Sequence, residues 1–236
     1  MTVNPIIVAL DFESAGEALA LVDRLGDRVG FYKVGMELYA SAGMETAREL
    51  RARGKDVFLD MKFYDIGETV RRAVCQVARA GVQFLTVHGS TPVLRAAIEG
   101  RGTSSLKLLA VTVLTSYDQQ DIEDLGYPCE LSALVDLRVR RAIEAGMDGI
   151  VASPLDAKRI RNIALKRSSE ITGPAPLLIT PGVRSAGSAA GDQKRVATPA
   201  EALRDGADYV VMGRQITRAA DPRGEVARVL DEIATV

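Results

Sequence analysis

The sequence is poor in the residues that build disulfide frameworks and metal centres: it has two cysteines, Cys75 and Cys129, and one histidine, His88. The spacing of the cysteines fits no metal-ligand motif, so we expect free thiols in a reducing compartment. No apolar run approaches the ~18 residues that a membrane span needs, and no charged segment followed by an apolar core stands at the N-terminus. These absences predict a cytoplasmic protein that does not enter a membrane.

Charge of one sign is not concentrated anywhere in the chain. Lys and Arg together number 30 against 31 Asp and Glu, and no basic block indicates a nucleic-acid-binding surface. With 47% apolar and 26% charged residues, the composition is that of an ordinary globular protein. The 236 residues are enough for one sizeable core, so we expect residues 1–236 to form a single domain.

Short β-branched runs alternate with amphipathic stretches along the chain. Eight runs are strand candidates: Ile6–Phe12, Phe31–Gly35, Val57–Phe63, Phe84–His88, Leu106–Leu114, Gly149–Ser153, Leu177–Pro181 and Tyr209–Gly213. Between them, apolar residues recur at the three- and four-residue spacing of helices. Eight β-then-α units predict an α/β fold, a closed (β/α)8 or TIM barrel, with an open doubly wound sheet as the alternative.

Charged residues interrupt or end the first three predicted strands. Asp11 ends the first, Lys33 lies in the second, and the third contains Asp60 and Lys62, with Asp65 just beyond it. Because side chains alternate across a strand, Asp60 and Lys62 are expected on the same face. Burial of an ion costs several kcal/mol unless a partner offsets it, so these residues form either a structural ion pair or a reactive site. Their alternating signs allow every member to stay charged near a substrate.

A phosphate site is expected where TIM barrels commonly have one, in the loops after the seventh and eighth strands. Pro181 and Arg184 follow the seventh predicted strand, and Gly213 and Arg214 follow the eighth. Arginine offers a charged planar fork to phosphate oxygens, and glycine permits close approach of the backbone. The segment between the two loops is small and polar, and we interpret it as a lid whose Gln193 bridges phosphate and base, or as a plain flexible loop.

With these residues the chain resembles the orotidine 5'-phosphate decarboxylases from Val8 to Pro222. The matching segments are Val8–Phe12, Lys33–Glu37, Phe58–Ile66, Val87–His88, Leu109–Ser116, Thr180–Arg184, Gly191–Arg195 and Met212–Arg214. The resemblance implies a TIM-barrel homodimer with shared active sites that converts orotidine 5'-monophosphate to UMP in de novo pyrimidine biosynthesis. It also implies that the carboxy-lyase reaction uses neither a metal ion nor an organic cofactor.

The resemblance further implies roles for single residues. Lys62 would stabilise and protonate the pyrimidine carbon that loses its carboxylate, and Asp60 would flank the departing group. Loss of CO2 leaves an electron pair outside the conjugated ring, so a nearby ammonium suits this step. Asp11 and Lys33 would hold the ribose and complete the charge array. Asp65, Ile66 and Thr69 would come from the partner subunit, and Asp65 would join Asp60 in keeping Lys62 charged and oriented. The other expected contacts are Thr115 and Ser116 at the base, and Pro181, Arg184, Gln193, Gly213 and Arg214 at the phosphate end.

Several of these residues could instead have a purely structural role. Asp65 would also make a good N-cap for the following helix. Thr115 and Ser116 could cap the next segment, as hydroxyls at strand ends often do. His88 is expected to be an ordered structural group and not the acid-base residue.

The chain departs from the family pattern after the third strand, because bacterial members usually read Phe-His-Asp-Ile-Pro-Asn-Thr where this sequence has Tyr64, Gly67 and Glu68. Two other functions are alternatives. Sugar-phosphate lyases such as 3-keto-L-gulonate 6-phosphate decarboxylase and hexulose-phosphate synthase resemble the third strand but recruit Mg²⁺ through an acid on the second, where this chain has Lys33. A phosphate-binding barrel without enzymatic activity would bind UMP and turn nothing over.

Overall fold

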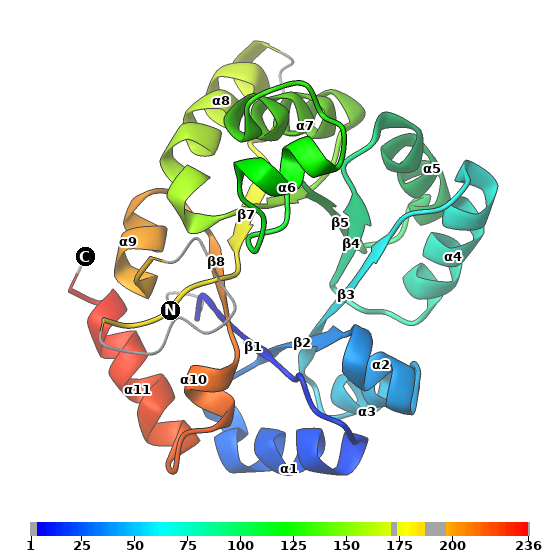
Figure 1. Cartoon of the computed structure of the whole chain (residues 1–236). Coiled ribbons are helices and arrows are strands. Elements are labelled where there is room, and N and C mark those ends of the chain that lie inside the picture. Colours follow the sequence, from blue (N-terminus) through cyan, green and yellow to red (C-terminus); the bar gives the residue numbers. More distant parts are fainter. Residues whose placement is uncertain (1–3, 171–173, 187–196, 236) are drawn as a thin grey trace.

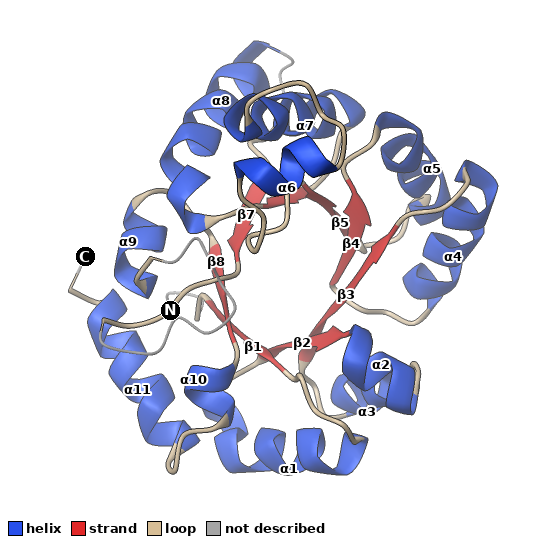
Figure 2. Ribbon diagram, viewed as in Figure 1, coloured by secondary structure: helices blue, strands red, loops and turns tan. Residues whose placement is uncertain are grey.

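The computed structural model describes residues 4–170, 174–186 and 197–235, and in this part of the chain eight parallel strands close into a barrel. The strands follow one another in chain order, and β8 pairs with β1 (Figure 1). Helices surround the ring of strands on the outside (Figure 2). The fold is therefore a (β/α)8 TIM barrel, and the open doubly wound alternative is wrong because the sheet closes.

The strands are β1 (Ile6–Ala9), β2 (Phe31–Gly35), β3 (Asp56–Phe63), β4 (Phe84–His88), β5 (Lys107–Val111), β6 (Gly149–Val151), β7 (Leu177–Thr180) and β8 (Tyr209–Met212). The helices are α1 (Ala15–Leu25), α2 (Met36–Ala42), α3 (Glu45–Ala52), α4 (Gly67–Arg79), α5 (Thr91–Arg101), α6 (Gln119–Asp124), α7 (Leu131–Ala145), α8 (Ala157–Glu170), α9 (Pro199–Arg204), α10 (Arg214–Thr217) and α11 (Pro222–Ile233), with the 3-10 turns η1 (Gly26–Arg28) and η2 (Pro154–Asp156). No described helix has the length and apolarity of a membrane span.

Five strands end one to three residues before the end of the apolar run that predicted them. β5 ends at Val111, for example, although the run continues to Leu114. Val113 and Leu114 line a pocket at the end of the barrel and no longer belong to the sheet. Apolar character therefore marks the wall of the pocket as well as the strand, and the sequence pattern alone cannot separate the two.

Side chains of each strand alternate between the barrel interior and the surrounding helices. In β1, Ile7 and Ala9 belong to a small interior cluster, whereas Ile6 and Val8 belong to the large cluster beneath the helices. The amino end of the barrel, where the strands begin, is filled by the rings of Phe31, Phe84 and Tyr209, whose centroids lie 4.8 to 5.7 Å apart. The carboxyl end, where the strands finish, carries the charged residues Asp60 and Lys62.

The amino end is also fixed by a bonding pattern that occurs three times. In each case the residue just before β4, β6 or β8 forms two hydrogen bonds with a residue near the start of the preceding strand. The backbone N–H of the first residue donates to the backbone carbonyl of the second. The side chain of the first residue accepts from the backbone N–H of the second. The three pairs are Gln83 with Val57 (2.9 and 2.7 Å), Asp148 with Leu108 (3.1 and 2.9 Å) and Asp208 with Leu178 (2.8 and 2.7 Å). Arg101 of α5 and Arg161 of α8 pair with the two aspartates.

Candidate active site

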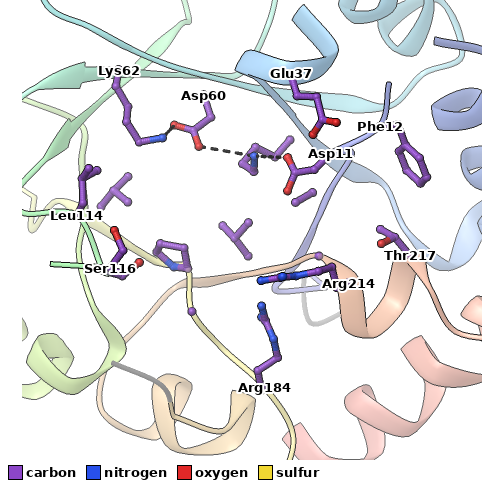
Figure 3. Close-up of a pocket in the computed structure, with 18 of the residues that line it drawn as sticks. Asp11, Phe12, Glu37, Asp60, Lys62, Leu114, Ser116, Arg184, Arg214 and Thr217 are labelled. Atoms are coloured by element: carbon purple, nitrogen blue, oxygen red, sulfur yellow. Dashed lines mark hydrogen bonds and ion pairs between the residues drawn. The ribbon is translucent and has the colours of Figure 1, made fainter. Parts of the chain in front are cut away.

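A pocket of about 760 Å³ opens at the carboxyl end of the barrel, within the size range of small-molecule sites. Its apolar floor is formed by the last inward-facing residues of four strands: Ala9, Val111, Val151 and Val211. Charged side chains lie around this floor and point into the same space (Figure 3). The pocket therefore has an apolar floor and a charged rim.

Four charged residues on β2, β3 and the end of the β1 segment form a continuous charge array: Asp11, Lys33, Asp60 and Lys62. The Lys33 ammonium lies 3.1 Å from Asp11 Oδ1 and 3.7 Å from Asp60 Oδ2. The Lys62 ammonium lies 2.9 Å from Asp60 Oδ1. The structure thus brings together the four residues at which the sequence placed alternating charges. Figure 3 shows Asp60 between Lys62 and Asp11.

The two inner members of the charge array, Lys33 and Asp60, stay charged although they are largely buried. The side chains of Lys33 and Asp60 are only 11% and 14% exposed. Burial alone would lower the pKa of Lys33, but the charges of Asp60 and Asp11 outweigh it and hold this pKa above its ordinary value. Burial alone would raise the pKa of Asp60, but Lys33 and Lys62, with the hydroxyl of Thr86, hold it below its ordinary value. The charges of Lys33 and Asp60 therefore depend on their neighbours.

Lys62 stands in an unusual backbone conformation. Its φ is +48°, and the pairing of β3 with β4 shifts register between Leu59 and Phe63. A left-handed conformation costs a non-glycine residue about 1–2 kcal/mol. Asp60 and Lys62 do lie on the same side, as predicted, but through this irregularity and not through the plain alternation of a regular strand. Strain of this kind persists where surrounding contacts hold it.

Thr86 of β4 provides such contacts, although no motif in the sequence points to it. Its hydroxyl accepts a 2.9 Å hydrogen bond from the backbone N–H of Lys62 and donates a 2.8 Å bond to Asp60 Oδ1. Thr86 is fully buried. A hydroxyl inside the otherwise apolar segment Phe84–Val87 is the signal that could have identified it, because a buried hydroxyl needs partners.

Two arginines occupy the opposite side of the pocket. Arg184, after β7, and Arg214, at the start of α10, both reach into the pocket across from Lys62 (Figure 3). Burial and the nearby Arg214 lower the pKa of the Arg184 guanidinium, so an anion between the two cations would be favourable. The neighbouring residues connect the two loops: Gln215 accepts from the Ser185 N–H at 3.0 Å and donates to the Ser185 hydroxyl at 2.9 Å.

The remaining expected contacts of this subunit lie partly in the pocket wall. Pro181 and Gly213 line it near the arginines, and Thr115 and Ser116 line it after β5. The alternative that these two hydroxyl residues cap the next segment is wrong, because Asp118 caps α6. Gln193 lies outside the described residues.

Asp65, Ile66 and Thr69 are exposed and lie outside the lining of this subunit's pocket. Asp65 Oδ1 accepts a 2.7 Å hydrogen bond from the N–H of Ile66. The N-cap position of α4 is Ile66, without a side-chain cap bond, so the N-cap interpretation of Asp65 is wrong. Ile66 is 73% exposed and Tyr64 is 69% exposed, so the loop between β3 and α4 presents large apolar side chains on the surface.

His88 also lies outside the pocket lining. Its ring packs on that of Tyr64, with 4.1 Å between the centroids. Burial and the charge of Arg138 lower the pKa of His88 to about 4, so its imidazole is neutral at physiological pH. These contacts fit a structural group and not an acid-base residue.

Known proteins resemble this chain over nearly its whole length. The sequence profile of the orotidine 5'-phosphate decarboxylase / HUMPS family matches residues 4–229. Orotidine 5'-phosphate decarboxylase of Nitrobacter winogradskyi is 50% identical, over 97% of this chain and 92% of that protein, and that of Caulobacter vibrioides is 49% identical over the full length of both. The crystal structure of orotidine 5'-phosphate decarboxylase from Lactobacillus acidophilus aligns with a TM-score of 0.80 at 33% identity, over 98% of this chain and 99% of that one. The chain belongs to the orotidine 5'-phosphate decarboxylase / HUMPS family.

Proposed function

We propose that this protein removes CO2 from orotidine 5'-monophosphate to give UMP, with Lys62 as the group that stabilises and protonates C6 of the pyrimidine. The enzyme is a carboxy-lyase of pyrimidine biosynthesis, as its curated relatives of about 50% identity indicate. The observation that carries the mechanism is the charge array on one side of a pocket whose other side holds two arginines. The free thiols of Cys75 and Cys129 support the expected cytoplasmic location.

The positions of the charged groups support one orientation of a bound nucleotide. Its phosphate would lie against Arg184 and Arg214, where two adjacent cations favour an anion and Pro181 and Gly213 bring the backbone close. The pyrimidine would then reach Lys62 on the opposite side, with Thr115 and Ser116 at its edge. The ribose hydroxyls would lie between the two ends, where Asp11 and Lys33 offer an acceptor and a donor.

The chemical step follows from the position of Lys62. The bond from C6 to the carboxylate carbon breaks, CO2 leaves, and the electron pair stays on C6 in an orbital outside the conjugated ring. The Lys62 ammonium stabilises this pair and donates a proton to it, and the resulting neutral amine regains a proton from solvent. Asp60 keeps Lys62 charged and oriented through their 2.9 Å contact.

The site is completed by a second subunit. Asp65, Ile66 and Thr69 lie away from their own pocket and are exposed, as residues that serve a neighbouring subunit must be. In a two-fold dimer each loop between β3 and α4 would enter the partner's site, and Asp65 would add a carboxylate beside the partner's Lys62. The exposed side chains of Tyr64 and Ile66 supply apolar surface for that contact.

The magnesium-dependent sugar-phosphate alternative has a specific difficulty in this chain. The ammonium of Lys33 already lies between the carboxylates of Asp11 and Asp60, at the place where those enzymes use an acid on the second strand. A fixed cation at this point repels a second one. The alternative of a binding protein without enzymatic activity does not explain why a half-buried lysine in a left-handed backbone conformation, Lys62, lines the pocket.

The test is the loss of absorbance that accompanies conversion of orotidine 5'-monophosphate. We expect turnover that EDTA leaves unchanged. Lys62→Ala should abolish turnover and keep most of the affinity for UMP, whereas Arg214→Ala should weaken UMP binding. Activity that EDTA removes and Mg²⁺ restores would assign the protein to the sugar-phosphate branch, and a Lys62→Ala variant with substantial turnover would disprove the role of Lys62.

A further inference from the structure

Gly35 is the last residue of β2 and lies beside the charge array. It is buried, and its φ of −96° and ψ of −175° describe extended backbone that any residue adopts. The usual reason for glycine, a left-handed conformation, therefore does not apply here. Something else about this position requires the absence of a side chain.

The neighbours of Gly35 supply the reason. Its side-chain direction is that of Phe31 and Lys33, since residues two apart in a strand face the same side, and Phe31 belongs to the barrel interior. A β-carbon at position 35 would lie 2.9 Å from the Lys33 ammonium nitrogen and 3.3 Å from Asp11 Oδ1. The first distance is too short for a real contact. The Lys33 ammonium thus occupies the space that a side chain at position 35 would fill.

We propose that Gly35 is a positioning residue: because it has no side chain, it leaves room for the Lys33 ammonium between Asp11 and Asp60. The inference rests on the proposed role of Lys33 at the ribose and in the charge array. The Lys33 side chain is long and flexible, so an added methyl group would displace the ammonium at little cost to the fold. It would lengthen the contact to Asp11 or Asp60, and a catalytic array tolerates only small errors of this kind.

Gly30 provides a matched control on the same strand. It stands directly before β2 at the amino end of the barrel, and a β-carbon there would meet nothing within 4 Å. Gly30→Ala and Gly35→Ala therefore make the same chemical change at opposite ends of one strand. Only the second reaches the charge array.

The experiment measures kcat, KM and thermal unfolding for both variants, and for Lys33→Ala with and without Gly35→Ala. Because a misplacement of about 1 Å can cost up to about 100-fold, we expect Gly35→Ala to lower kcat/KM by about 10- to 100-fold. Its melting temperature should stay close to that of Gly30→Ala, whose kinetics should match the wild type. In the Lys33→Ala background the same substitution should cost less than about two-fold, because the displaced group is gone.

Three outcomes would overturn the proposal. They are wild-type kinetics in Gly35→Ala, an equal loss with and without Lys33, and an unfolded or strongly destabilised Gly35→Ala protein. Failure of the underlying function is separable from these: if Lys33→Ala keeps wild-type turnover, the role of Lys33 is wrong, whereas an impaired Lys33→Ala beside a normal Gly35→Ala rejects the inference about Gly35 alone.

Discussion

The two ends of the barrel both hold aspartates beside cations, but they use them differently. At the amino end, Asp148 accepts from the backbone N–H of Leu108 and pairs with Arg101, so the carboxylate joins a helix to a strand. At the carboxyl end, Asp60 lies between two ammonium groups that face a pocket. The first arrangement fixes the sheet, whereas the second holds charge where a substrate would bind.

The difference has an energetic consequence. A carboxylate that satisfies a buried backbone N–H stabilises the fold, because removing it leaves that donor without a partner. An array of buried charges adds little net stability, since removing each ion from water offsets most of its attraction to its neighbours. We therefore expect substitutions at the amino end to change stability and substitutions at the carboxyl end to change turnover.

The largest effect expected at the carboxyl end comes from the shared site. Lys62→Ala and Asp65→Ala should each lose activity by at least about 1,000-fold as homodimers, because proton donation and its electrostatic support act together. In a mixed dimer one site carries both changes and the other carries neither. Random pairing makes about half of the dimers mixed, so co-expression should restore about a quarter of wild-type activity, and purified mixed dimers about half.

The control for this experiment is the verified composition of the mixed dimer, obtained with two different affinity tags. If both parents are inactive and the mixed dimers remain inactive as well, Asp65 does not act across an interface. Because the N-cap position of α4 is Ile66, an N-cap role would not then be available as an explanation. Asp65 would have to act through its own subunit.

The amino end should respond in stability alone. Asp148→Ala removes the acceptor of the Leu108 N–H and the partner of Arg101, and we expect a loss of about 2–3 kcal/mol in the free energy of unfolding. Asp148→Asn keeps an oxygen for the N–H and should lose less. Denaturant unfolding measures both, and kcat should equal the wild-type value. A fall in kcat without a fall in stability would contradict the expected difference between the two ends of the barrel.

Thr86 tests whether a neutral group at the carboxyl end belongs to the catalytic machinery. Thr86→Val keeps the shape but removes the hydroxyl that contacts Lys62 N–H and Asp60, and a net hydrogen-bond contribution of 1–2 kcal/mol corresponds to a fall of about 10-fold in kcat. Thr86→Ser keeps the hydroxyl and should recover most of this loss. Equal activity of the two variants would mean that Thr86 acts through packing alone.

The sequence predicted the barrel and the charge array because both depend on patterns that are local in the chain. Alternation of apolar runs fixes the β-then-α units, and strand ends place Asp11, Lys33 and Asp60 together. The contacts of Thr86 could not be predicted in this way, since they depend on a register shift between β3 and β4. The role of Gly35 could not be predicted either, because it depends on where the Lys33 ammonium lies in the folded protein.

The smallest expected effect concerns His88, a carboxyl-end residue to which the structure gives a stabilising and not a chemical role. Its folded-state pKa of about 4 lies below the ordinary 6.5, through burial and the charge of Arg138, while its ring packs on Tyr64. Between these two values the unfolded chain binds a proton that the folded protein does not, so the stabilisation is present above pH 6.5 and is lost as the pH falls towards 4. One pKa unit is worth about 1.4 kcal/mol and partial exposure screens part of it, so we expect a contribution of about 1–2 kcal/mol.

His88→Gln should flatten the dependence of unfolding free energy on pH in this window relative to the wild type, with unchanged turnover at neutral pH. Identical slopes in both proteins would show that His88 titrates normally, and lost turnover would move it into the chemistry of the carboxyl end.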